Sequence, residues 1–136
     1  MHRAGVGTMR DMHSIVSGLF LASLQNRELT LREKIGLWRA KASSGVSSMW
    51  KEMLTTDLSE LVPRVDVPVY FFHGVHDRTC SYAESVKYFD RLVAPMKGFY
   101  TFSESAHSPL FEEPDRLRAI LREDVLRGTN HLADRR

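Results

Sequence analysis

The sequence predicts an α/β protein in which a helical part precedes a strand–helix–strand–helix unit with parallel strands. Residues 67–72 and 98–102 are apolar runs rich in aromatic side chains, typical of strands covered on both faces. The segment between them has the apolar spacing of a helix, and such an order joins parallel strands through a right-handed crossover. Residues 1–60 instead show apolar side chains at steps of three and four, which indicates short helices.

Four short helices are expected in the first part of the chain. Thr8 is placed as the N-cap of the first helix, and Thr30 with Glu33 forms a capping box that begins the second. The run at 43–45 (SSG) ends this second helix. The expected helices cover residues 9–20, 31–42, 49–54 and 57–61.

Capping and turn residues bound the elements of the second part. Ser81 and Glu84 form another capping box, and Pro95 stops the helix that follows it. Pro114 opens a final helix, for which Gly128 is a natural C-cap. The side chains expected to face inward from these two helices are Tyr82, Val86, Phe89, Val93, Leu117, Ile120, Leu121 and Val125.

Two parallel strands do not complete a sheet by themselves. Parallel sheets are covered on both faces, and their edge strands are paired or protected. We therefore expect residues 63–127 to form the end of a larger α/β fold. Residues 128–136 follow the last helix and are expected to be a flexible tail.

The composition is that of an ordinary globular domain. The chain has 136 residues, of which 43% are hydrophobic and 26% charged, with a net charge of +2. Because the cations are not clustered, we expect no nucleic-acid partner. No apolar run approaches the length of a membrane span, and the single cysteine, Cys80, cannot form an internal disulfide. These features predict a cytoplasmic protein with no membrane partner.

Two side chains suited to acid–base chemistry follow the predicted strands. Asp77 lies three residues after Gly74, and His107 lies five residues after Phe102. The carboxyl ends of parallel strands share one edge of the sheet, so we expect both side chains to meet there. A carboxylate that orients a histidine, and a histidine that acts as general base, are two parts of a nucleophilic triad.

Two other chemical interpretations of this region are open. Cys80 lies near a helix N-terminus, where a thiol gains nucleophilicity, but it is more simply a small buried or capping residue. His73, His76 and Asp77 contain metal-ligand side chains, but Gly74 and the strand end remove the regular spacing that a metal site needs. We expect no metal and no cofactor.

Several segments resemble the α/β-hydrolase superfamily, and loosely its proline-iminopeptidase-like branch. Residues 67–77 (VPVYFFHGVHD) look like the strand that ends in the family's triad acid. Residues 105–109 (SAHSP) and 112–114 (EEP) are similar to the loop that bears the catalytic histidine and to the start of the last helix. Residues 57–63 (DLSELVP) resemble the connection from a helical cap, so the resemblance spans residues 57–127.

The resemblance implies a partial α/β-hydrolase fold. Residues 1–62 would be a portion of the helical cap or lid, and residues 63–127 the C-terminal part of the core. Asp77 and His107 would be the acid and the histidine of a Ser–His–Asp triad in an ester or amide hydrolase. The substrate would be a small ester or a peptide-like molecule.

The sequence departs from this family at the nucleophile. α/β-Hydrolases carry it in a Gly-x-Ser-x-Gly turn upstream of the acid, and this chain contains no such motif. We therefore expect the isolated chain to be inactive and the nucleophile to come from a missing N-terminal half. The chain would then be a truncated gene product, the product of an alternative start within a longer frame, or one half of a split enzyme. The sequence is also compatible with an aspartate nucleophile, as in dehalogenases and epoxide hydrolases.

A second class of function is a non-catalytic interaction fragment. The exposed sheet edge of such a fragment would pair with a partner chain or with a second copy of itself, which gives a homo-oligomer. Oligomerisation without hydrolysis would distinguish this class from the enzyme.

Overall fold

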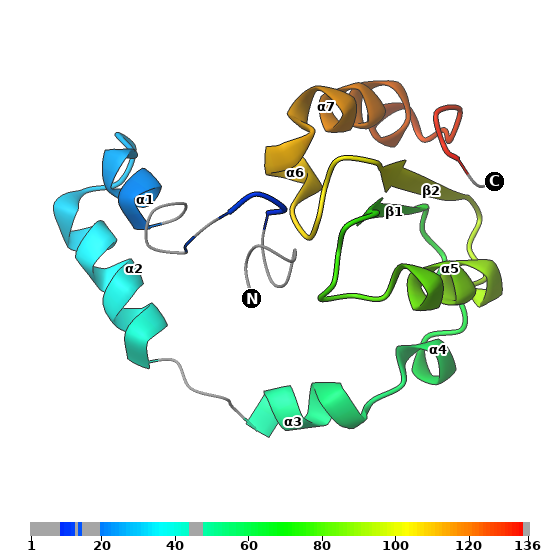
Figure 1. Ribbon diagram of the computed structural model, residues 1–136. Helices are drawn as coiled ribbons and strands as arrows, with labels where there is room; N and C mark the ends of the chain where they lie inside the picture. The colour runs from blue at the N-terminus through cyan, green and yellow to red at the C-terminus, as the bar shows by residue number, and fades with distance from the viewer. Residues whose placement is uncertain (1–8, 13, 15–19, 44–47, 135–136) are drawn as a thin grey trace. The chain divides into compact units, whose positions relative to one another are not determined.

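The computed structural model describes residues 9–12, 14, 20–43 and 48–134, and the chain forms two compact units (Figure 1). One unit comprises His13–Asp57, and the other comprises Met1–Met12 together with Leu58–Arg136. Within the described residues, no helix is both long and apolar enough to cross a membrane.

The first unit is helical, with α1 (Leu21–Gln25), α2 (Leu31–Ser43) and α3 (Ser48–Thr55). The predicted capping box precedes α2, since Glu33 N donates to Thr30 Oγ1 at 3.3 Å and Thr30 N donates to Glu33 Oε2 at 2.8 Å. The helix expected over residues 9–20 is wrong at its start, because Met12 N donates to Met9 O in a turn. Residues 13 and 15–19 of that expected helix, and its N-cap Thr8, lie outside the described residues.

The second unit mixes helices with a two-stranded parallel sheet, which confirms the α/β class. Val69 lies opposite Lys97 at the start of the ladder, and Gly74 lies opposite Phe102 at its end. The first strand begins two residues later than expected, after Pro68, because proline has no N–H for the ladder. The elements are α4 (Leu58–Leu61), β1 (Val69–Gly74), α5 (Tyr82–Arg91), β2 (Lys97–Phe102), α6 (Pro109–Glu112), α7 (Pro114–Glu123) and the 3₁₀ helix η3 (Val125–Arg127).

The two faces of the sheet carry aromatic side chains in alternation, and α5 and α7 lie on opposite sides of the strands (Figure 1). On the α5 side, the Phe89 ring lies 5.4 Å from the ring centroids of both Phe71 and Phe99. On the α7 side, Tyr100 and Phe102 are buried and pack with helix side chains of α7. This alternation follows from the two-residue period of a strand.

Several helix positions depart from the expected inward faces. Val93 follows the end of α5 and is 46% exposed, because the helix stops at Arg91 and the chain turns there. Leu121 is also exposed in part, whereas Leu117 and Ile120 are buried as predicted. Cys80 is exposed, so its interpretation as a buried residue is wrong.

Residues 128–134, which the sequence placed in a flexible tail, are joined to β2 and α7 by hydrogen bonds. Gly128 adopts the left-handed conformation of a C-cap, with φ of 66°, but it ends the 3₁₀ helix η3. The helix that Pro114 opens, α7, stops earlier and has Asp124 as its C-cap. Asn130 Nδ2 then donates to Lys97 O at 2.7 Å, and Asp134 N donates to Phe99 O at 2.8 Å. This segment therefore covers the outer edge of β2.

Asp124 is a fully buried carboxylate that joins the C-terminal segment to the sheet. It accepts hydrogen bonds from Tyr100 Oη at 2.9 Å and from Thr129 Oγ1, His131 N and Leu132 N at 2.8 Å each. Burial alone would raise the pKa of Asp124, but these hydrogen bonds lower it below its ordinary value. The same burial, and the neighbouring carboxylate, raise the pKa of Tyr100.

Candidate functional site

Asp77 and His107 meet beyond the carboxyl ends of β1 and β2. His107 Nδ1 lies 2.8 Å from Asp77 Oδ2, a hydrogen-bond distance. The Asp77 side chain is 6% exposed and the His107 side chain 39% exposed, so the carboxylate is shielded while the imidazole is accessible. The two side chains are 30 residues apart in the sequence, and the parallel topology brings them together.

A turn that follows β1 holds the Asp77 carboxylate. Asp77 Oδ1 accepts hydrogen bonds from Thr79 N at 2.7 Å and from Cys80 N at 3.1 Å. Burial would raise the pKa of Asp77, but the His107 ring and the two backbone amides lower it below its ordinary value. Asp77 is therefore ionised at neutral pH, and each of its two oxygens takes part in hydrogen bonding.

A glycine lets the two loops approach one another. A Cβ atom at Gly74 would lie 2.1 Å from Ala106 O and 2.4 Å from Ser105 O, closer than any side chain tolerates. Just after it, Val75 N donates to Phe102 O at 2.9 Å. This close approach of the backbones places Asp77 within reach of the loop that carries His107.

Two glutamates that sequence reasoning did not assign a role fix the loop that carries His107. Glu112 Oε2 accepts from Ala106 N at 2.9 Å and from Ser108 N at 3.3 Å, on either side of the histidine. Glu113 Oε2 accepts from Ser105 Oγ at 2.6 Å. The Glu-Glu-Pro run before a helix was a visible signal, but two adjacent acids are more simply read as helix N-terminal charges.

His73 is buried under this site and does not join the metal cluster that the sequence allowed. Burial lowers the pKa of His73 below its ordinary value, and the imidazole is therefore neutral at pH 7. Its ring packs edge-on to Tyr82 at 5.3 Å and stacks with Phe99 at 6.3 Å. Within the described part of the chain, the group suited to a metal ion is a different one: Asp77, Cys80 and His107.

The environment of Cys80 does not favour a nucleophilic thiolate. Partial desolvation of the thiol, and the charge of Asp77, raise the pKa of Cys80 above its ordinary value. The thiol is therefore protonated at neutral pH. The raised pKa therefore favours Cys80 less as an attacking group than its sequence position near a helix start suggested.

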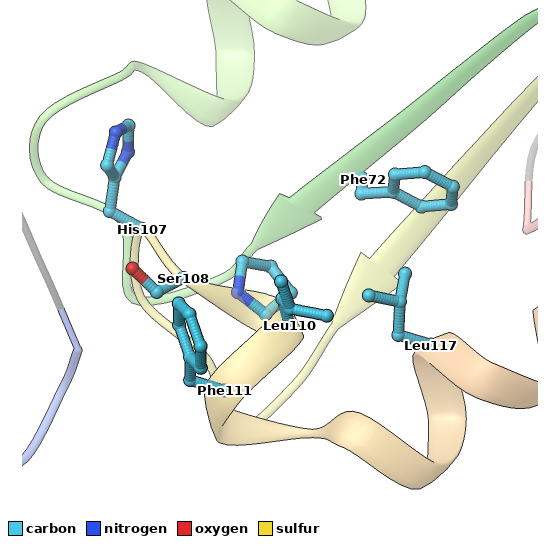
Figure 2. Close-up of a pocket in the computed structure, with 7 residues that line it drawn as sticks. Phe72, His107, Ser108, Leu110, Phe111 and Leu117 are labelled. Carbon is cyan, nitrogen blue, oxygen red and sulfur yellow. The ribbon is translucent and has the colours of Figure 1, made fainter. Parts of the chain in front are cut away.

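An apolar pocket of about 290 Å³ opens beside His107 (Figure 2). Figure 2 shows Phe72 from β1 and Leu117 from α7 at one end of the pocket, with His107 at the other. An apolar cavity next to an imidazole is the usual surrounding of a bound organic substrate. The remaining lining residues are Ser108, Pro109, Leu110 and Phe111.

Comparison with known proteins supports a relation to a hydrolase over part of the chain. Over 53 residues the chain is 42% identical to "Probable aminopeptidase YbaC" of Bacillus subtilis (strain 168). The match covers 39% of this chain and 17% of YbaC, so it spans less than a fifth of that protein's length. No family model and no solved structure matches the chain.

Proposed function

We propose that the chain carries the acid and the histidine of an acyl hydrolase that acts on an ester or a peptide-like bond within an α/β-hydrolase fold. The observation that carries this proposal is the 2.8 Å contact between His107 Nδ1 and Asp77 Oδ2. The partial similarity to a probable aminopeptidase agrees with it. In this proposal residues 1–62 contribute to a cap and residues 63–127 to the core.

The contact assigns a role to each nitrogen of the imidazole. With Nδ1–H donating to the ionised Asp77, the lone pair of His107 Nε2 is available as a general base. His107 would take the proton of the attacking hydroxyl, give it to the leaving group, and later take a proton from water to release the acyl group. Asp77 would hold the ring in this tautomer and stabilise the imidazolium.

The nucleophile and the oxyanion donors of this reaction come from outside the described residues. The sequence has no Gly-x-Ser-x-Gly turn, and Cys80 is a protonated thiol. We propose that a part of the protein outside these 136 residues supplies a serine nucleophile opposite His107 Nε2, and that these residues alone are inactive. The apolar pocket beside His107 would hold an apolar group of the substrate.

Reconstitution tests the proposed function. The chain is mixed with YbaC from which the matched segment has been deleted, and hydrolysis of p-nitrophenyl esters and aminoacyl p-nitroanilides is measured. We expect the mixture to hydrolyse at least one of these substrates and His107→Ala to lower the rate by at least about 10³-fold. His131→Ala, which removes an exposed imidazole elsewhere, is the matched control and should leave the rate unchanged.

Two outcomes would contradict the assignment. A reconstituted enzyme whose His107→Ala variant keeps its full rate does not use this histidine as its base. Hydrolysis by the isolated chain that disappears with His107→Ala would mean that the nucleophile lies in this chain, and Cys80→Ser would then be the next variant to assay.

A second candidate function is favoured by the open edge of β1. Among the described residues β1 pairs only with β2, whereas residues 130–134 cover the outer edge of β2. Such an edge can pair with a strand of a partner chain or of a second copy. Light scattering after size-exclusion chromatography tests this: a stable, inactive oligomer supports an interaction fragment, and a monomer argues against self-pairing.

A further inference from the structure

A third metal-ligand side chain lies beside the acid and the histidine. The ligand atoms of Asp77, Cys80 and His107 all lie within 4.8 Å of one another. They come from two loops, since the Asp77 turn carries the cysteine and the loop after β2 carries the histidine. Cys80 N donates to Asp77 Oδ1 at 3.1 Å, so the same hydrogen bond that orients the carboxylate holds the cysteine backbone beside it.

The donor set selects the kind of cation. Thiolate, imidazole and carboxylate together suit Zn²⁺, whereas Mg²⁺ and Ca²⁺ prefer sites made of oxygen alone. In a tetrahedral Zn²⁺ site the ligand atoms lie roughly 3.3–3.6 Å apart, given bonds of about 2.0–2.3 Å. Modest movements of side chains at an exposed loop bring atoms within 4.8 Å to that spacing.

We propose that Asp77, Cys80 and His107 bind one Zn²⁺ ion, with water as the fourth ligand. As the Zn–S bond forms, the Cys80 thiol releases its proton to solvent. In the metal-free chain Asp77 Oδ2 and His107 Nδ1 lie 2.8 Å apart, too close for two ligands of one tetrahedral ion. Zn²⁺ binding therefore breaks that hydrogen bond, or engages the other imidazole nitrogen or carboxylate oxygen.

The consequence for catalysis is inhibition, and only this consequence rests on the proposed function. A metal-bound imidazole cannot accept the proton of a nucleophile, so the site cannot hold Zn²⁺ and act as the acid–base pair at once. The loop that joins Asp77 to Cys80 would thus make the enzyme sensitive to free zinc. The binding of the metal itself depends on the three side chains alone.

Cadmium titration of the full chain tests the site without any substrate. Cys80 is the one cysteine in the sequence, so any cadmium–thiolate charge-transfer absorption reports on it alone. We expect one Cd²⁺ per chain, displaced by Zn²⁺. Cys80→Ser should abolish the band, and Asp77→Asn and His107→Ala should each weaken binding by more than about tenfold. His131→Ala is the control and should bind as the unmodified chain does.

The ring resonances of His107 provide a second readout that needs no variant. Zn²⁺ should shift them, and leave those of His131 in place, in nitrogen-detected NMR spectra of the unmodified chain. If the His107→Ala and Asp77→Asn variants bound cadmium as tightly as the unmodified chain does, a lone thiol would be the binding group, and the proposal would be overturned. So would the absence of a band at stoichiometric Cd²⁺. Neither result touches the hydrolase proposal, because no hydrolysis is measured.

Discussion

Asp77 and Asp124 are both shielded carboxylates with lowered pKa values, but their hydrogen-bond partners differ in kind. Asp124 is fully buried and accepts from two hydroxyls and two backbone amides, each of which is itself buried or partly buried. Asp77 accepts from two backbone amides and from His107, whose side chain is 39% exposed. One carboxylate joins elements of the fold, and the other presents a titratable ring to solvent.

This difference separates a structural carboxylate from a candidate functional one. Hydrogen bonds to fixed, buried partners stabilise the fold, and such partners are shielded from any reactant. A hydrogen bond to an exposed imidazole adds little stability, because water can replace it. The proposed function instead uses this hydrogen bond to orient Nε2 toward another reactant. Removing the Asp124 carboxylate should therefore lower mainly the stability. Removing the Asp77 carboxylate should impair mainly the proposed acid–base chemistry.

The largest effect on stability is expected from Asp124→Ala. This change leaves the hydroxyls of Tyr100 and Thr129 and the amides of His131 and Leu132 without their acceptor. We expect the free energy of unfolding, measured with urea, to fall by about 3–5 kcal/mol. Tyr100→Phe removes only one donor and should cost about 1.5–3 kcal/mol. A loss below 1 kcal/mol for Asp124→Ala would mean that this carboxylate does not join the elements as the structure indicates.

As the pH is lowered, the free energy of unfolding should fall in two separate steps. The lowered pKa of buried His73 means that the folded state resists the proton that the unfolded state binds below about pH 6.5, so stability falls from there downward. Asp124 and Asp77 also have lowered pKa values, and the stability that they contribute is present above about pH 4 and lost below it.

Urea unfolding curves between pH 3 and 8 measure both steps. His73→Phe keeps a ring against Phe99 and should remove the upper step while leaving the lower one. Asp124→Asn should reduce the lower step more than Asp77→Asn does, because the Asp124 carboxylate accepts four hydrogen bonds that favour its ionised form and the Asp77 carboxylate accepts three. An upper step that persists in His73→Phe would assign it to another histidine.

The sequence predicted most of the second unit, because its signals are local and agree with one another. Ser81 accepts from Glu84 N as the capping box required, and Gly128 takes the left-handed conformation. The parallel pairing follows from chain connectivity alone, so it was predictable without knowledge of packing. By contrast, Leu31, the first residue of the helix expected over residues 31–42, is an apolar side chain that is 72% exposed. Periodicity identifies an apolar face but not what covers it.

The candidate site was predictable in its pair of residues but not in its support. Asp77 and His107 follow strand ends, and strand order places them together. The roles of Glu112 and Glu113 depend on which backbone amides a folded loop leaves unpaired, and no local pattern encodes that. The position of Cys80 was not predictable either. The sequence suggested a nucleophile or a small buried or capping residue, and the structure shows an exposed cysteine next to both site residues.

The smallest effect on stability is expected from His107→Ala. Since this imidazole is exposed in part and its hydrogen bond with Asp77 competes with water, we expect the free energy of unfolding to change by less than about 0.5 kcal/mol. The matched variant Asp77→Asn should cost somewhat more, about 1 kcal/mol, because a neutral amide oxygen accepts from Thr79 N and Cys80 N less strongly than the carboxylate does. If His107→Ala instead destabilised the chain as much as Asp124→Ala, the histidine would be a structural partner of Asp77. The exposed Nε2 would then have no claim to a catalytic role.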